Sequence, residues 1–503
     1  MSALGLLAVL TPVGGESQAW GAGCTAGTES DFNGDGVRDV AIADPLATVT
    51  GHPNAGQVDV VYGGGKGTLR LTQAVDWVPG DSETGDQFGF ALATYDANLD
   101  GCSDLVVGAP YEDVGTARDS GAAYVLYGSA TGLGGGTTKA ASFDEDDSRF
   151  VGFTAEAGDW LGYAVAAGKS AAGVPFLAVG APGESLGTLP QAGAFFYLYG
   201  TGFTTTDVNQ DSPGVSGGVA ERNDRFGGSL AATANHLAVG NPGEAVGSEE
   251  FAGSVILFNH TIKDGRPTPL GSITQEGPID VGASEAGDRF AESLAMVPYR
   301  PSGAASATSS LLVVGAPGED LEAAVDAGSL VVYEISPAGT PLSQIIINQS
   351  KPDIDGDGET ETGDYFSQKL AAVNTAPTAV GSASTLLVAV GSPGEDTAAG
   401  VDTGLVQVFP LIGSPGTSDV VLSPGSRGVP GTEQARDYTG MSLATAGNQL
   451  YLGAPYGSPV DRAVLGIPWS AVGAATISPI TVWKPGQGGI ATDGVVAFGA
   501  VAR

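Results

Sequence analysis

The sequence of 503 residues is poor in basic residues and in histidine, and both shortages limit what the protein can do. Its 20 lysines and arginines stand against 56 aspartates and glutamates, giving a formal net charge of −36 that repels nucleic-acid phosphates and anionic lipid head groups. We therefore expect no nucleic-acid partner. The three histidines, His52, His236 and His260, are not part of any recognisable zinc, serine-nucleophile or cysteine-nucleophile motif.

Long apolar runs and cysteines are scarce as well. The apolar run at residues 3–10 is too short to span a bilayer, and Ser17-Gln18-Ala19 supplies the small residues that signal peptidase prefers. We interpret residues 1–19 as a signal peptide and expect a secreted or extracellular protein, free or cell-surface associated, with no transmembrane anchor in the mature chain. Two cysteines, Cys24 and Cys102, then predict one disulfide, although sequence cannot show that their Cα atoms come within bridging distance.

Glycine is abundant, and it marks an internal repeat. The 80 glycines and 30 prolines indicate many tight turns, while 42% hydrophobic residues suffice for a packed core. A short apolar strand that ends in a Gly-Ala-Pro-like turn recurs seven times. The turns are Ala43-Asp44-Pro45, Gly108-Ala109-Pro110, Gly180-Ala181-Pro182, Gly240-Asn241-Pro242, Gly315-Ala316-Pro317, Gly391-Ser392-Pro393 and Gly453-Ala454-Pro455.

A second element, of the type Gly-Asp-x-Phe-Gly, precedes most of these turns. It occurs at residues 85–89, 158–162, 223–227, 287–290, 363–366 and, more weakly, 436–440. The first turn has no such element before it, whereas Phe498-Gly499 near the C-terminus has no turn after it. The repeat is therefore circularly shifted between the two ends of the chain.

These paired motifs resemble FG-GAP repeats, the units of the integrin α-subunit propeller and of many bacterial extracellular proteins. The resemblance covers nearly everything after Cys24 and implies an all-β, seven-bladed β-propeller over residues 20–503, in which stacked sheets leave only short edges. We expect a strand from Val495 to Val501, carrying Phe498, to close the ring in the blade that contains residues 40–43. The phenylalanine of each motif is interpreted as core filling between blades.

Residues 31–39 present oxygen atoms in a pattern typical of a hard-cation site. The side chains of Asp31, Asn33, Asp35 and Asp39 and the backbone carbonyl of Val37 alternate along the loop, which contains glycine where the chain must turn sharply. Calcium fits such a loop better than magnesium, which prefers to keep its water ligands. We therefore predict bound Ca²⁺.

Residues 96–104 repeat this pattern in the second unit and in the same register. The predicted ligands are the side chains of Asp96, Asn98, Asp100 and Asp104 and the carbonyl of Cys102. The FG-GAP resemblance also implies calcium in this loop. The alternative is an Asp- and Asn-rich turn that caps its own backbone. Later units lack the pattern, so we expect metal in the first blades alone.

A third acidic loop lies outside this register, just before Gly363-Asp364. Its candidate ligands are Asp353, Asp355, Asp357, Glu359 and Glu361. Calcium binding and a solvated acidic loop both remain open for this segment.

A glutamate also recurs after the Gly-Ala-Pro-like turns, at Glu184, Glu244, Glu319 and Glu395. One interpretation is a repeated turn whose glutamate is solvated. The other is a rim of carboxylates that accepts cations or a basic partner.

Together these features favour a secreted, calcium-binding β-propeller that acts, as a monomer, as an adhesion or ligand-binding module for a protein or glycan. The alternative is a secreted hydrolase or lyase that uses loop carboxylates on the propeller face. A cluster of buried carboxylates with perturbed pKa values in one pocket favours the enzyme, and the absence of a pocket beyond the central channel favours the binding module.

Overall fold

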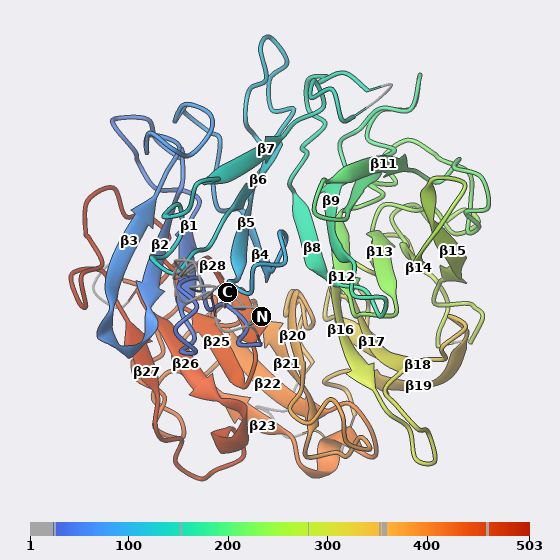
Figure 1. The fold of residues 1–503 in the computed structure, drawn as a ribbon. Helices are drawn as coiled ribbons and strands as arrows, with labels where there is room; N and C mark the ends of the chain where they lie inside the picture. Colours follow the sequence, from blue (N-terminus) through green and yellow to red (C-terminus); the bar gives the residue numbers. More distant parts are fainter. Residues whose placement is uncertain are drawn as a thin grey trace, which may run out of the picture.

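The computed structural model describes residues 24, 27–150, 153–279, 281–351, 354, 360–458 and 462–503. These residues form seven antiparallel sheets of four strands each, arranged in a ring as a β-propeller (Figure 1). The predicted all-β, seven-bladed fold is confirmed. The described residues contain three short 3₁₀ helices, η1 (Gly63–Gly65), η2 (Pro415–Thr417) and η3 (Trp469–Ala471), and no helix long and apolar enough to cross a membrane. The predicted signal peptide, residues 1–19, lies outside the described part of the chain.

Each blade is one sheet, and its strands follow one another in sequence except in the first. Blade 1 contains β28 (Val501–Ala502), β1 (Val40–Asp44), β2 (Gln57–Tyr62) and β3 (Gly67–Leu71). Blade 2 contains β4 (Ala91–Tyr95), β5 (Asp104–Ala109), β6 (Ala122–Leu126) and β7 (Ala140–Phe143). Blade 3 contains β8 (Ala164–Lys169), β9 (Pro175–Ala181), β10 (Ala194–Tyr199) and β11 (Thr204–Val208).

The remaining four blades repeat the same order. Blade 4 contains β12 (Ser229–Ala232), β13 (Leu237–Asn241), β14 (Ser254–Lys263) and β15 (Arg266–Ile273). Blade 5 contains β16 (Ser293–Tyr299), β17 (Ser309–Ala316), β18 (Ser329–Ile335) and β19 (Pro341–Ile347). Blade 6 contains β20 (Lys369–Asn374), β21 (Leu386–Ser392), β22 (Leu405–Pro410) and β23 (Val420–Leu422). Blade 7 contains β24 (Ser442–Ala446), β25 (Gln449–Gly453), β26 (Val464–Pro468) and β27 (Thr481–Trp483).

Residue size and burial follow the position of a strand within its blade. The innermost strands β4, β8, β12, β20 and β24 are rich in alanine, which lets the sheets converge on the central channel. The next strands outward, such as β5, β9 and β17, are buried at each residue because a neighbouring blade covers either face. Outer strands such as β3 are partly exposed. This gradient is why the strand before each Gly-Ala-Pro-like turn reads as a continuous apolar run.

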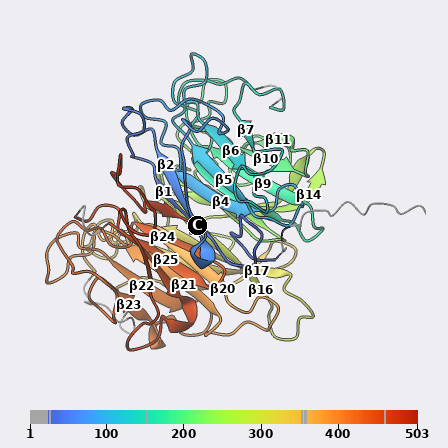
Figure 2. The same cartoon turned by 60° about the vertical axis from the view of Figure 1, so that its left-hand side comes forward.

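The ring closes in blade 1, as the shifted repeat predicts. The last strand pairs with the first, Ala502 opposite Ile42 and Val501 opposite Ala43, and β28 also contacts β24 of blade 7. Figure 2 shows the C-terminus among these inner strands. The predicted closing strand, Val495 to Val501 with Phe498 on it, is wrong in extent, because the strand covers only 501–502.

The reason is that the Phe-Gly element is a turn. Gly499 has φ +87°, a conformation that strands do not use, and the Asp44 carboxylate accepts the backbone N–H groups of Val496 and Ala497 at 2.7 and 2.8 Å. Phe498 is fully buried just before the strand, in the core between blades 7 and 1.

The equivalent turns join the other blades in the same way. In five of the six motifs the aromatic or aliphatic residue is fully buried in an interblade core, at Phe88, Leu161, Phe226, Phe290 and Phe366. Gly108 of one Gly-Ala-Pro turn lies so close to the next blade that an added Cβ would stand 2.1 Å from the carbonyl oxygen of Gly162. The interpretation of these motif residues as packing elements is confirmed.

The glutamates after the turns do not form an exposed rim. Glu184, Glu244 and Glu395 are 7%, 6% and 2% exposed, and Glu319 is partly buried. Both sequence interpretations, a solvated turn and a rim open to partners, are therefore wrong. These side chains point into the interfaces between blades, where side chains of the preceding blade meet them.

Candidate metal centre

The two predicted calcium loops occupy equivalent places in blades 1 and 2. Residues 31–39 lead directly into β1, and residues 96–104 connect β4 to β5. Both loops lie at the end of the second strand opposite to its Gly-Ala-Pro-like turn. The corresponding hairpins of blades 3, 4 and 7, at residues 170–174, 233–236 and 447–448, contain no acidic residue. The sequence register thus places the two acidic loops side by side on one face.

Within the first loop, the oxygens of positions one, three and five hold a nested turn. The Asp31 carboxylate accepts the N–H groups of Asp35 and Gly36 at 3.1 and 2.8 Å, and the Asn33 side chain also accepts from Asp35 at 3.1 Å. Asp35 accepts from the N–H of Val37 at 2.8 Å. Asp31 is buried, whereas Asp35 is exposed.

The second loop repeats this network almost bond for bond. Asp96 and Asn98 each accept the Asp100 N–H at 3.0 Å, and Asp100 accepts the Cys102 N–H at 2.9 Å. It differs in two added contacts: the Asn98 amide donates to Asp100 at 2.9 Å, and Lys169 of blade 3 forms an ion pair with Asp96 at 2.9 Å. The second loop therefore already has a positive charge at its first position.

The ninth position has a different role from the others. Asp39 is fully buried and accepts the N–H groups of Phe32 and Gly63, both at 2.8 Å, so it ties the loop to the end of β2. Asp104 makes the same pair of bonds to Ala97 and Gly128. Burial raises the pKa of Asp39 to about 6 and that of Asp104 to about 7.

The loops fit calcium in donor chemistry but do not hold their carboxylates in a closed cage. Among the described residues, the groups of three acidic or sulfur side chains with ligand atoms within 4.8 Å do not include the three aspartates of either loop. Positions one, three and five supply the oxygen donors that Ca²⁺ prefers. The carbonyls of Val37 and Cys102 lie between these positions and the clamp at position nine. Calcium binding therefore stays a prediction for both loops, with Asp35 and Asp100 as their exposed carboxylates.

A disulfide and backbone bonds join the two loops into one unit. Cys24 and Cys102 are bonded, with 5.0 Å between their Cα atoms, so the predicted pairing is confirmed. Ser103 donates its N–H to the carbonyl of Asp31 at 2.9 Å. Cys24 packs so tightly on Gly34 (φ +65°) that a Cβ added there would lie 2.5 Å away. Since both sulfurs are in the disulfide, the nearby group of Cys24, Asp100 and Cys102 is no thiolate metal site.

The third candidate loop is mostly outside the described residues. This applies to Asp353, Asp355, Asp357 and Glu359. Glu361 is partly buried, and its backbone N–H donates to Asp364 at 2.7 Å in the following Phe-Gly element. Glu361 therefore lies at the turn end of blade 6, away from the face that carries the two N-terminal loops.

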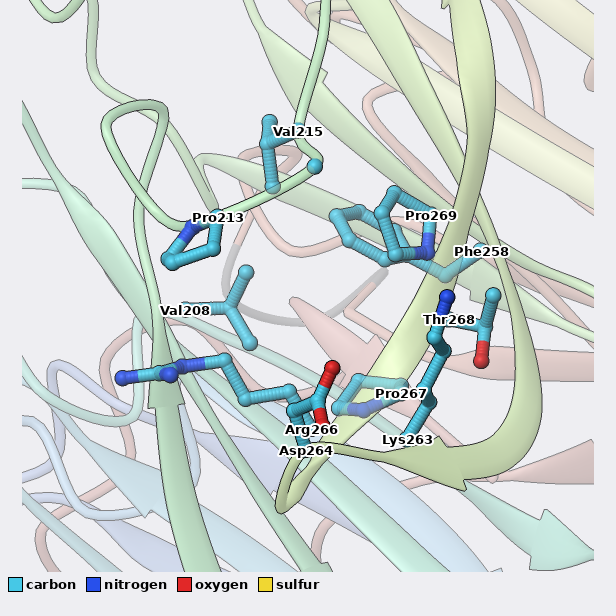
Figure 3. A pocket seen from close by; sticks show the side chains of 11 residues that line it. Val208, Pro213, Val215, Phe258, Lys263, Asp264, Arg266, Pro267, Thr268 and Pro269 are labelled. Carbon is cyan, nitrogen blue, oxygen red and sulfur yellow. The ribbon is translucent and has the colours of Figure 1, made fainter.

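The propeller offers more than one cavity for a ligand. The central channel, about 610 Å³, is lined by the innermost strands together with Glu29 and Arg503. A second pocket of about 400 Å³ lies at the outer rim, between the end of β11 and the β14–β15 hairpin (Figure 3). Its wall combines Val208 and several prolines with the basic side chains of Lys263 and Arg266. The propeller therefore has a pocket besides the central channel, a point that the sequence alone could not decide.

Comparisons with known proteins support the repeat assignment. The FG-GAP repeat model matches residues 88–126, which begin at Phe88, contain the second acidic loop and end at β6. The phosphatidylinositol-glycan-specific phospholipase D of Homo sapiens is 35% identical over 109 residues, 21% of this chain and 13% of the enzyme. Integrin alpha-PS5 of Drosophila melanogaster is 31% identical over 160 residues, 30% of this chain and 14% of the integrin. Integrin alpha-PS2 of the same organism is 33% identical over 108 residues, 20% of this chain and 7% of that integrin.

The chain thus spans about one seventh or less of the length of these relatives. The resemblance to FG-GAP propellers of the integrin α type, drawn from the paired motifs, is confirmed. Sequence reasoning missed the anchoring role of the ninth position in each loop. Its signal was present, because Asp39 and Asp104 come directly before or begin a fully buried strand, where an unpaired carboxylate must find hydrogen-bond donors.

Proposed function

We propose that this chain, an integrin-α-like FG-GAP β-propeller, is a secreted calcium-binding module for adhesion or for recognition of a protein or glycan. The observation that carries the proposal is the pair of acidic loops, 31–39 and 96–104, which stand in one register on neighbouring blades. Their oxygen donors suit calcium, and the integrin relatives align with part of the propeller.

In each loop, one aspartate anchors the loop to the fold and another is available to a metal ion. Asp39 and Asp104 hold the loops to the strands through backbone bonds that form without a metal. Asp35 and Asp100 are exposed, and each accepts the backbone N–H of the residue two positions later, so their side chains can reorient toward a cation. Bound calcium supplies the positive charge that offsets the carboxylates of each loop. The disulfide fixes the two loops against each other. Calcium bound to both loops would therefore make this face of blades 1 and 2 one rigid surface.

A catalytic role finds weaker support. The relatives include a phospholipase, but the aligned segment is 13% of that enzyme. The most compact carboxylate group among the described residues, Glu145, Asp159 and Glu184, is between 1% and 7% exposed, so a substrate cannot reach it without separating two blades. A hydrolase or lyase activity would be recognised by cleavage of a ligand in the binding experiment described next.

Binding to protein and glycan arrays, in calcium and in EGTA, tests the proposal. We expect a ligand class that the wild-type protein binds in calcium and loses in EGTA. The double variant Asp35→Ala/Asp100→Ala should lose the same signals, whereas Asp76→Ala, an exposed aspartate outside the loops, should keep them. Binding that ignores both EGTA and the double variant would contradict the calcium-dependent module. Release of cleaved glycan from the array would favour the enzyme instead.

A further inference from the structure

The interfaces between blades contain a repeated buried pair of side chains that lies outside the two acidic loops. A glutamine two residues after the outermost strand of one blade donates its side-chain N–H to the glutamate that follows the next blade's Gly-Ala-Pro-like turn. The bond is 2.5 Å long in each of four interfaces. The pairs are Gln73 with Glu112, Gln210 with Glu244, Gln275 with Glu319, and Gln349 with Glu395.

The interface between blades 2 and 3 breaks this pattern. The residue two positions after β7 is Glu145, where the four interfaces above have glutamine. It meets Glu184, which follows β9, and Asp159 of the Phe-Gly element of blade 3. One carboxylate oxygen from each of the three lies within 4.8 Å of the others. Three carboxylates thus stand where the four glutamine-containing interfaces place two carboxylates and an amide donor.

The cluster is buried and lacks hydrogen-bond donors. Glu145 and Asp159 are 1% exposed and Glu184 is 7% exposed. Both carboxylate oxygens of Glu145, one of Asp159 and one of Glu184 are buried without a hydrogen-bond partner. The other oxygen of Asp159 accepts the N–H of Glu156 at 2.6 Å, as its counterparts do in other blades. Buried carboxylates without donors are costly and call for a compensating charge.

The described protein groups around the cluster do not supply that charge. Arg149, four residues after Glu145, pairs with Asp147 and with the carbonyl of Ser142. Glu156 and Asp207 add further negative charge near Glu184.

We propose that Glu145, Asp159 and Glu184 bind one divalent cation of the calcium type between blades 2 and 3. Ca²⁺–oxygen bonds of about 2.3–2.6 Å place ligand oxygens up to about 5 Å apart across the ion, which agrees with the spread of the three carboxylates. A set made of oxygen donors selects a hard cation. Calcium tolerates an irregular, water-poor site, whereas magnesium demands regular geometry and keeps several waters.

Such an ion would add to the backbone hydrogen bonds and the Lys169–Asp96 ion pair that already join blades 2 and 3. Glu145 belongs to blade 2, and the other two ligands belong to blade 3. This site is independent of the exposed loops 31–39 and 96–104, since it shares no residue with them.

Counting bound calcium in matched variants tests the site. Glu145→Gln recreates the glutamine of the other interfaces, so the variant should fold. Gln210→Glu builds the same three-carboxylate set at the next interface, with Asp224 and Glu244. After removal of metal with EGTA and dialysis against CaCl₂, we expect Glu145→Gln to bind one Ca²⁺ fewer than wild type by elemental analysis and calorimetry. Gln210→Glu should bind one more. Asp35→Ala/Asp100→Ala should leave the Glu145-dependent ion in place, which separates this site from the loops.

Melting temperatures give a second readout. In EGTA, Glu145→Gln should melt higher than wild type because it removes an uncompensated charge, and calcium should raise the wild type more than the variant. Protonation of Glu145 is the competing way to relieve the cluster, since burial raises the pKa of this carboxyl. Equal calcium counts in wild type and Glu145→Gln, with stability differences that depend on pH alone, would overturn the metal site in favour of a shared proton.

Discussion

Substitution of Phe498 by alanine tests how the two ends of the chain close the ring. Phe498 is fully buried in a core that joins blade 7 to blade 1 and includes Ile42, Tyr451, Val464 and Ala502. Truncating a buried phenylalanine to alanine typically costs about 3–5 kcal/mol, because the lost burial is compounded by the cavity left behind. We expect Phe498→Ala to lower the free energy of unfolding by about this amount.

A matched variant at an internal interface separates the closure from a general core effect. Phe226 is the equivalent fully buried residue between blades 3 and 4. Urea unfolding followed by tryptophan fluorescence should show similar losses for Phe498→Ala and Phe226→Ala. Hydrogen exchange should rise in β1 and β24 for Phe498→Ala but in β9 and β13 for Phe226→Ala. If Phe498→Ala cost less than about 1 kcal/mol while Phe226→Ala cost the full amount, packing at the terminal seam would not hold the ring closed.

Three further predictions concern a buried acid, the disulfide and a close contact. Burial raises the pKa of Glu244 from 4.5 to about 8, so its contribution to stability is fully present below pH 4.5 and is lost as pH rises through 8. In urea unfolding, the free energy of unfolding of Glu244→Gln should therefore equal that of wild type at pH 4 and exceed it by on the order of a few kcal/mol at pH 9. Replacing Cys24 and Cys102 by serine opens a link across 78 positions and should lower the free energy of unfolding by about 4 kcal/mol, whereas a loss below 1 kcal/mol would mean that the disulfide does not constrain the unfolded chain. Gly453→Ala would place a Cβ 2.1 Å from the Gly499 carbonyl oxygen and should lower the melting temperature. The control Gly473→Ala meets no atom within 4 Å and should leave it unchanged. Equal melting temperatures for the two variants would contradict the close approach between Gly453 and Gly499.

Much of the fold was readable because its repeats depend on local backbone geometry. A Gly-Ala-Pro-like turn needs small residues where the next blade packs closely against it, as at Gly108 beside Gly162. Seven copies of the turn therefore predicted seven blades. The closing strand was misplaced for a related reason. The motif around Phe498 resembles a strand in composition, but Gly499 at φ +87° and the Asp44 carboxylate hold it as a turn.

The acidic residues were harder to interpret because their environment comes from distant parts of the chain. Glu244 reads as a solvated turn residue, yet Gln210, 34 positions earlier, meets it inside an interface. Asp39 is predicted as a metal ligand from its position alone, which does not reveal that its two oxygens also accept the backbone N–H groups of Phe32 and Gly63. Periodicity locates such residues in the blade, but only the packing of successive blades decides whether they face water, backbone or each other.

Calcium-dependent stability is the most direct test of calcium binding by the loops 31–39 and 96–104. Melting temperature and proteolysis should be measured in CaCl₂ and in EGTA, in the Glu145→Gln background so that the interblade cluster contributes nothing. Each independent loop site should add about 2.7 kcal/mol at one hundred times its Kd, because calcium binds the folded loop and not the unfolded chain. Calcium binding by these loops predicts that this gain, and protection of residues 31–39 and 96–104 from protease, disappears in Asp35→Ala/Asp100→Ala. Unchanged melting and cleavage on chelation would contradict it and would show both loops to be ordinary acidic turns.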